Sequence, residues 1–132
     1  MLNDLTPNKQ QIVFGDDSIV IQKYISGIKG GRTLDVTGFT EPVIKAGHPI
    51  IVKDGVYAPM PVKDGHYELS TPVGAVFAGV LYRSIPTANP AASIMTAGEV
   101  NSELSPYPLN TLPMDEFKQA CPHIVFIKDE EA

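Results

Sequence analysis

The sequence predicts a single, mainly β domain, a small β-barrel or other β-rich fold, with one short helix near the C-terminus and an extended N-terminal arm. The pattern Val-Lys-Asp-Gly-x-Tyr occurs at Val52–Tyr57 and again at Val62–Tyr67. Asp-Gly between apolar or aromatic residues is a strong hairpin signal, because glycine adopts positive φ without steric strain. Two such turns ten residues apart predict a small antiparallel meander.

Two further observations favour the same fold class. The chain has 12 prolines and 11 glycines in 132 residues, a content that suits a β protein with many corners. Its most apolar run, Val73–Tyr82, is broken by two glycines and is too short to span a membrane. This run predicts a strand buried on both faces, with glycine where another backbone comes close.

Composition and charge restrict the possible partners. The apolar fraction of 43% predicts a folded chain, and the net charge of −5 argues against nucleic acid as a partner. A lone Cys121 cannot form an intrachain disulfide and fits a reducing compartment. Neither a signal peptide nor a membrane helix is expected, so we expect a soluble protein, made in a cytoplasm, with no membrane partner.

The chain divides into an arm, residues 1–17, and a domain, residues 18–132. The arm is polar except for the β-prone patch Ile12, Val13 and Phe14. Strands are predicted at Ser18–Ile25 and Arg32–Phe39, joined by a hairpin turn over Gly27–Gly31.

The last third is expected to contain a strand, a helix and a final strand. Ala91–Glu99 is predicted as a strand ended by Gly98, and Ser105–Pro113, with three prolines, as irregular. A short amphipathic helix over Pro113–Ala120 follows, with Thr111 as its cap and Met114, Phe117 and Cys121 on its inner face. His123–Lys128 is the last strand.

No constellation for catalysis or metal binding emerges, so no cofactor and no enzymatic activity are expected. His48, His66 and His123 lack the spacing of a zinc site and are expected at the surface or in packing. Cys121 and His123 have no orienting third group, which favours a packed thiol over a nucleophile.

Two other motifs also favour structural roles. The segment Ser26–Thr33 (SGIKGGRT) lacks the spacing of a phosphate loop and is better explained as a hairpin turn. Asp54 and Asp64 are expected to form turns, since neither repeat supplies the several oxygens of a calcium loop.

The order of segments resembles that of the lambda-type head decoration proteins of tailed bacteriophages. The resemblance covers about two-thirds of the chain and rests on the order of its elements more than on any single motif. The matching segments are Ile50–Gly55, Val76–Leu81, Ile94–Val100, Met114–Ala120 and Ile124–Ile127.

The resemblance implies a capsid-stabilising protein of the virion. It implies a homotrimer on the outer surface of an expanded capsid, with an N-terminal arm that adds a strand to the major capsid protein. Ile12, Val13 and Phe14 suit such strand addition, although they can equally form the first strand of the domain. The region Ser18–Phe39 is richer in strands than the family's usual arm, which leaves open where the arm ends.

Other functions remain open. One alternative is a head fibre or tail accessory protein. Another is a small β-barrel adaptor that binds a peptide or a carbohydrate in an aromatic-lined groove. The residues that would line such a groove are Tyr24, Tyr57, Tyr67, Tyr82 and Tyr107.

Overall fold

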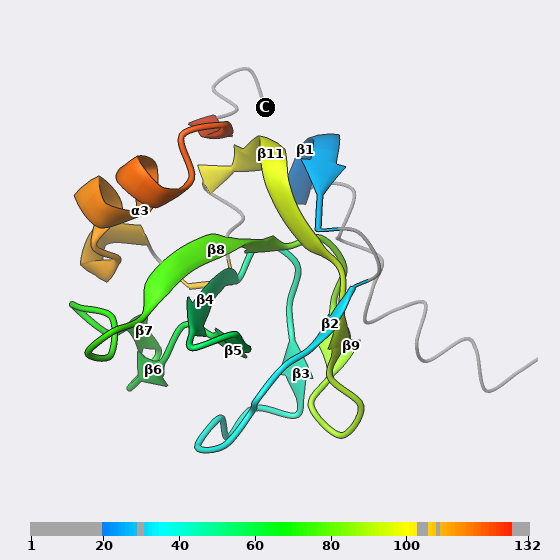
Figure 1. Ribbon diagram of the computed structural model, residues 1–132, viewed down its shortest axis with the longest axis vertical. Coiled ribbons are helices and arrows are strands. Elements are labelled where there is room, and N and C mark those ends of the chain that lie inside the picture. Colours follow the sequence, from blue (N-terminus) through cyan, green and yellow to red (C-terminus); the bar gives the residue numbers. More distant parts are fainter. Residues whose placement is uncertain (1–19, 29–30, 103–105, 108, 128–132) are drawn as a thin grey trace, which may run out of the picture.

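A computed structural model describes residues 20–28, 31–102, 106–107 and 109–127. The predicted arm, including Ile12, Val13 and Phe14, lies outside the described residues. The described chain is mainly β with a single short α-helix near the C-terminus, as the sequence predicts (Figure 1). The strands do not close into a barrel within the described part of the chain, so the barrel alternative is wrong there.

The largest sheet among the described residues has six strands, in the order β1–β11–β8–β4–β5, with β12 as a further partner of β11. The long strand β11 is its hub, because it pairs with β1 and β8 in antiparallel fashion and with β12 in parallel fashion. The strands of this sheet are β1 (Ile21–Gly27), β4 (Pro49–Lys53), β5 (Val56–Pro59), β8 (Val76–Leu81), β11 (Ile94–Asn101) and β12 (Ile124–Ile127).

Three two-stranded ribbons complete the β structure. They pair β2 (Arg32–Thr33) with β10 (Ala91–Ala92), β3 (Val43–Ile44) with β9 (Ile85–Pro86), and β6 (Val62–Lys63) with β7 (His66–Tyr67). The predicted strand Arg32–Phe39 is therefore wrong beyond its first two residues. The predicted hairpin from Ser26 to Thr33 is also wrong, because β1 pairs with β11 and β2 pairs with β10.

Both Asp-Gly hairpins are confirmed. The turn between β4 and β5 has positive φ at Asp54 (52°) and Gly55 (80°), and the turn between β6 and β7 repeats this at Asp64 (56°) and Gly65 (78°). Two successive residues with positive φ are what a two-residue hairpin turn of type I′ requires.

The strand predicted over Val73–Tyr82 forms at Val76–Leu81, and one of its two glycines stands at a close backbone approach. A Cβ on Gly79 would overlap the carbonyl oxygen of Met95 on β11. Gly98 does not end its strand, contrary to the prediction; β11 continues to Asn101. Instead, a Cβ on Gly98 would overlap the carbonyl oxygen of Lys23 on β1, so glycine lets the two strands approach.

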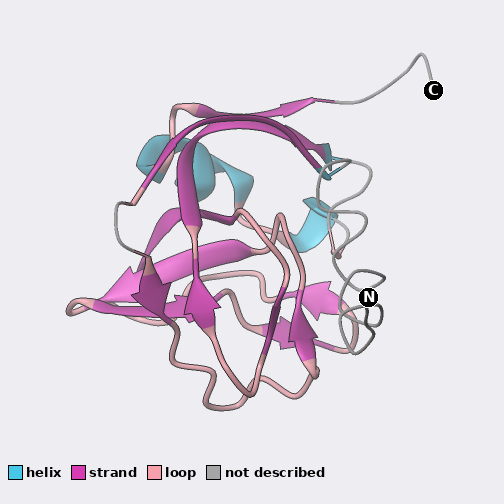
Figure 2. Ribbon diagram, turned by 90° about the vertical axis from the view of Figure 1, so that its right-hand side faces the viewer, coloured by secondary structure: helices cyan, strands magenta, loops and turns pink. Residues whose placement is uncertain are grey.

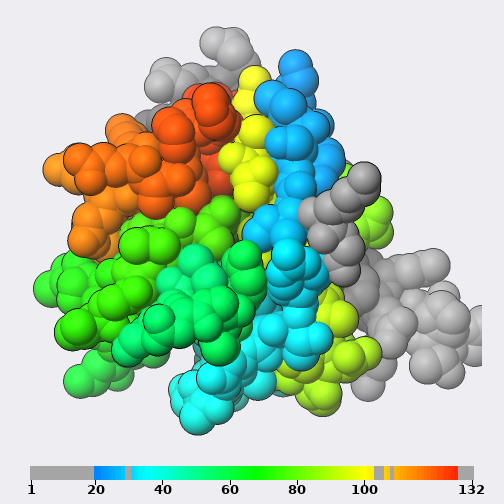
Figure 3. All heavy atoms as spheres, in the orientation of Figure 1, coloured from blue at the N-terminus to red at the C-terminus, as the bar shows by residue number. Residues whose placement is uncertain are grey.

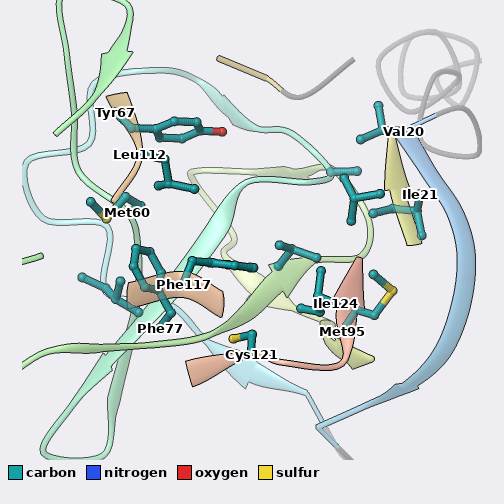
Figure 4. Close-up of a cluster of buried hydrophobic side chains, with 14 of the residues drawn as sticks. Val20, Ile21, Met60, Tyr67, Phe77, Met95, Leu112, Phe117, Cys121 and Ile124 are labelled. Atoms are coloured by element: carbon teal, nitrogen blue, oxygen red, sulfur yellow. The ribbon is translucent and has the colours of Figure 1, made fainter. Parts of the chain in front are cut away.

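The central strands are buried on both faces by two hydrophobic cores. Alternate residues point to opposite sides, so that Ile50, Leu81 and Ile94 lie in one core. Their neighbours Ile51, Val80 and Met95 lie in the other, larger core (Figure 4). The smaller core lies toward β2, β3, β9 and β10, and the larger one is closed by the helix.

The helix α3 (Met114–Ala120) fills the concave side of the sheet, and Figure 2 shows the strands arching over it. Phe117 is fully buried and meets Phe77 of β8 and Phe126 of β12 at ring-centroid distances of 5.1 and 5.3 Å. The predicted cap is wrong: the N-cap position is Pro113 with no side-chain cap, and the Thr111 hydroxyl is buried without a partner. Thr111 instead ends a 3-10 turn, η2 (Leu109–Thr111), in the stretch that was predicted to be irregular.

Candidate functional site

The three histidines lie in different places, and only His48 is buried. His66 belongs to the β6–β7 ribbon and His123 precedes β12, both exposed. Within the described residues, no group of three or more His, Cys, Asp or Glu side chains is placed to hold a metal ion. The arrangement agrees with the expectation of surface and packed histidines.

His48 is the centre of an aromatic cluster. Its ring contacts those of Phe39, Tyr67 and Tyr107 edge-on, at centroid distances of 5.5, 5.3 and 6.0 Å. Its Nε2 donates to the carbonyl oxygen of Met60 at 2.9 Å. Burial lowers the pKa of His48 from 6.5 to about 4, so the ring is neutral and packs as part of the core.

Cys121 is a packed thiol, as predicted. It is buried directly after α3, and burial raises its pKa to about 11. A thiol with such a pKa is protonated near neutral pH and is a poor nucleophile. Asp54 and Asp64 lie at the tips of exposed hairpins and serve as turn residues.

The five tyrosines fall into separate environments. Tyr67 and Tyr107 belong to the aromatic cluster around His48. Tyr57 packs against the guanidinium of Arg32, with 5.5 Å from Cζ to the ring centroid. Only Tyr24 and Tyr82 meet at an open groove on the surface, where their ring centroids are 4.6 Å apart and the rings are tilted by 49°.

This groove, which we call the Tyr–Arg groove, runs between β1 and the segment from Tyr82 to Ile94. It consists of two adjoining hollows with volumes of about 910 and 700 Å³. Tyr24, Tyr82 and Arg83 line both of them. Figure 3 shows β1, in blue, alongside the yellow strand β11. Hollows of this size accept small ligands or a few units of a polymer.

The backbone fixes the position of the Tyr24 ring. Tyr24 stands on the edge strand β1, with its hydroxyl over Gly27 three residues further along the chain, where an added Cβ would lie 2.7 Å from that oxygen. Gly27 therefore leaves room for the phenol ring to lie along the strand. Tyr24 remains 47% exposed, so its outer surface is available to a ligand.

The two arginines of the chain, Arg32 and Arg83, both line the first hollow. Arg83 stacks on Tyr82, with 5.4 Å from Cζ to the ring centroid. Arg32 is held from two sides, by the Tyr57 ring and by a hydrogen bond of 2.6 Å from Nη1 to the Gly31 carbonyl oxygen. Both guanidinium groups are thus oriented before any ligand arrives.

Two of the five tyrosines named from the sequence line this groove, whereas its arginines were not named from the sequence. Tyr82 is at least 50 residues from Tyr24 and Arg32 in the sequence, and the three come together through the pairing of β1 and β8 with β11 and of β2 with β10. The available signal was compositional: a chain with eight lysines has only two arginines. Nothing local indicated that the two would share a surface.

Comparison with known proteins gives no relative: no protein-family model, no curated protein and no solved structure matches the chain. The helices of the described residues are too short to cross a membrane.

Proposed function

We propose that this protein is a structural component of a phage or prophage virion that binds the outside of the capsid as a trimer and stabilises the expanded head. The observation that carries the proposal is the order of elements in the resemblance to lambda-type decoration proteins. The chain has an Asp-Gly hairpin, an apolar strand with an internal glycine, a long strand, a short helix and a final strand, in that order. The proposed site of action is the outer surface of the virion.

The N-terminal arm is the proposed attachment element. The first described strand, β1, is an edge strand that pairs only with β11 among the described residues, so residues 1–17 precede the rim of the sheet. In the proposed complex, Ile12, Val13 and Phe14 add a strand to an exposed edge of the major capsid protein. Burial of these apolar side chains offsets the entropy lost when the arm becomes ordered.

The loop between β7 and β8 is the proposed contact between copies. It carries the two most exposed large apolar side chains described, Val73 at 90% and Leu69 at 76%, and Val76 follows them at the start of β8. Clustered exposed apolar residues are typical of interaction surfaces. A trimer would present three arms at once, so modest individual contacts add through effective concentration.

The test is to count this chain against the major capsid protein in gradient-purified particles from the source, by quantitative mass spectrometry. A ratio near one to one supports decoration. A few copies per particle would favour the alternative of a head fibre or tail accessory protein, and absence from particles would contradict the proposal.

A second experiment tests the arm directly. Particles lacking this chain are mixed with purified protein, and co-sedimentation is compared for the wild type, for Ile12→Asp/Phe14→Asp and for the control Asp54→Asn. We expect the arm variant to lose binding and the control to retain it. Equal binding by all three would assign attachment to another surface.

A peptide- or carbohydrate-binding adaptor is the second candidate function. The Tyr–Arg groove favours it, since an open groove lined by Tyr24 and Tyr82 is the feature that such an adaptor needs.

A further inference from the structure

The charge of the Tyr–Arg groove is opposite to that of the whole chain. The protein carries 15 acidic and 10 basic residues, yet the described lining of the two hollows includes Arg32, Arg83 and Lys23 and no aspartate or glutamate. Two of these three cations are the only arginines in the sequence. A basic groove on an acidic protein favours an anionic ligand.

The guanidinium groups indicate which anion. Arginine binds a carboxylate through two parallel hydrogen bonds, and a guanidinium that is already oriented loses less entropy on binding. Arg83 is stacked on Tyr82 and Arg32 is held by Tyr57. A polyphosphate chain such as nucleic acid needs a longer line of cations than these, and the net charge of −5 opposes it.

The tyrosines indicate the rest of the ligand. Tyr24 and Tyr82 form one aromatic wall, and an aromatic ring offers a flat apolar face with a hydroxyl at its tip. The C–H face of a pyranose ring packs on such a wall, while its hydroxyl groups bond to polar neighbours. Ser93 and Thr33 supply further hydroxyls in the same hollow.

We propose that the Tyr–Arg groove binds an acidic oligosaccharide whose pyranose rings carry carboxylates, that is, a chain of uronic acids. A uronic acid presents an apolar face and a carboxylate on one ring, which matches Tyr24 and Tyr82 beside Arg83. The larger hollow, at about 910 Å³, has room for more than one such ring. This inference rests on the second candidate function, a carbohydrate-binding groove, and names its ligand class; it does not depend on attachment to a capsid.

An acidic peptide is a less suitable occupant. A peptide strand would have to add to the edge of β1 that pairs with no other described strand, but the pairing of β1 with β11 shifts register at three places between Ile21 and Gly27. Bulges of this kind bend and twist an edge strand away from regular pairing with a further strand. A ligand held by side chains needs no regular strand edge.

The experiment is a titration of the purified full chain with a tetramer of galacturonic acid, followed by isothermal calorimetry and by tyrosine fluorescence, which is readable because the chain has no tryptophan. Neutral galactose tetramer and hexaglutamate serve as comparison ligands. We expect saturable binding of the uronic acid tetramer, weaker at high salt, and no measurable binding of the other two. Equal binding of hexaglutamate, or no binding of the uronic acid tetramer at millimolar concentration, would overturn the proposal.

Three variants locate the binding. Arg83→Gln should weaken it about tenfold or more, because a charged hydrogen-bonded contact is lost. Arg83→Lys should also weaken it, since lysine keeps the charge but not the paired donors. Tyr24→Ala should weaken it without unfolding the protein, because Tyr24 is half exposed.

The matched control is Lys63→Gln, which removes one cation from the β6–β7 ribbon, away from β1 (Figure 1). It should bind like the wild type. If Lys63→Gln weakens binding as much as Arg83→Gln does, the attraction is diffuse and the assignment to the groove is wrong.

Discussion

At the scale of single residues, the buried His48 makes the stability of the fold depend on pH. Its pKa is about 4 in the folded protein and near 6.5 when unfolded, because burial disfavours the charged ring. Stability from this residue is fully present above pH 6.5 and is lost as pH falls toward 4, since the unfolded chain then binds a proton that the folded chain does not. The difference between the two pKa values corresponds to a decrease of about 3 kcal/mol in the free energy of unfolding.

Urea denaturation at pH 7.5 and pH 4.5 measures this loss. His48→Gln, which cannot titrate, should show a smaller difference between the two pH values than the wild type. The exposed His66→Gln is the control and should behave like the wild type. An unchanged pH dependence in His48→Gln would assign the effect to other groups.

Gly79, in the central strand β8, should tolerate substitution poorly. A methyl group there would overlap the backbone of Met95, which cannot move without separating β8 from β11. We expect Gly79→Ala to lower the free energy of unfolding by about 3 kcal/mol or more. The control Gly38→Ala, with φ +84° but no atom within 4 Å, should lower it by only about 1 kcal/mol. The measurement is thermal denaturation of both variants. An equal decrease in the free energy of unfolding for Gly79→Ala and Gly38→Ala would contradict the steric argument.

At the scale of elements, the Asp-Gly turns connect sequence directly to structure. Asp54 and Asp64 have positive φ, a conformation that asparagine adopts more readily than alanine. Asp64→Ala should therefore lower the free energy of unfolding by about 1 kcal/mol, and Asp64→Asn should leave it nearly unchanged. Urea denaturation of the two variants tests this: at equal m-values, the midpoint of Asp64→Ala should be lower than that of Asp64→Asn.

Elements defined by neighbouring residues were predictable, and elements defined by distant partners were not. The two hairpins, α3 and β12 follow from local patterns in a few consecutive residues, and all are confirmed. Arg32–Phe39 has strand-like composition, but among the described residues only Arg32 and Thr33 pair as a strand, with Ala92 and Ala91. Gly98 was interpreted as a terminator because nothing local shows that Lys23 passes beside it.

At the scale of the whole molecule, the same limit applies to function. The Tyr–Arg groove unites residues from β1, from the chain around β2 and from the segment that follows β8, which only the sheet topology brings together. The tyrosines could be named from the sequence as groove candidates, because their chemistry is recognisable alone. Their separation into two sets, one around His48 and one in the groove, required the fold.

The trimer proposal makes a prediction about the stability of the assembled molecule. A fold that is stabilised by association has a melting temperature that rises with protein concentration, since binding between copies favours the folded state by mass action. We expect this rise in the wild type between micromolar and millimolar concentrations. Leu69→Ser/Val73→Ser should abolish it without lowering the melting temperature of the dilute protein, because both side chains already contact solvent.

Differential scanning calorimetry over the concentration series, with sedimentation equilibrium at the same concentrations, makes the measurement. The control is Val56→Ser, which alters an exposed valine on β5, outside the β7–β8 loop, and should keep the rise. A monomer with a constant melting temperature would remove the trimer from the proposed function. A trimer that survives Leu69→Ser/Val73→Ser would move the contact to another surface, because substitution of these two side chains by serine deprives the β7–β8 loop of its most exposed apolar surface.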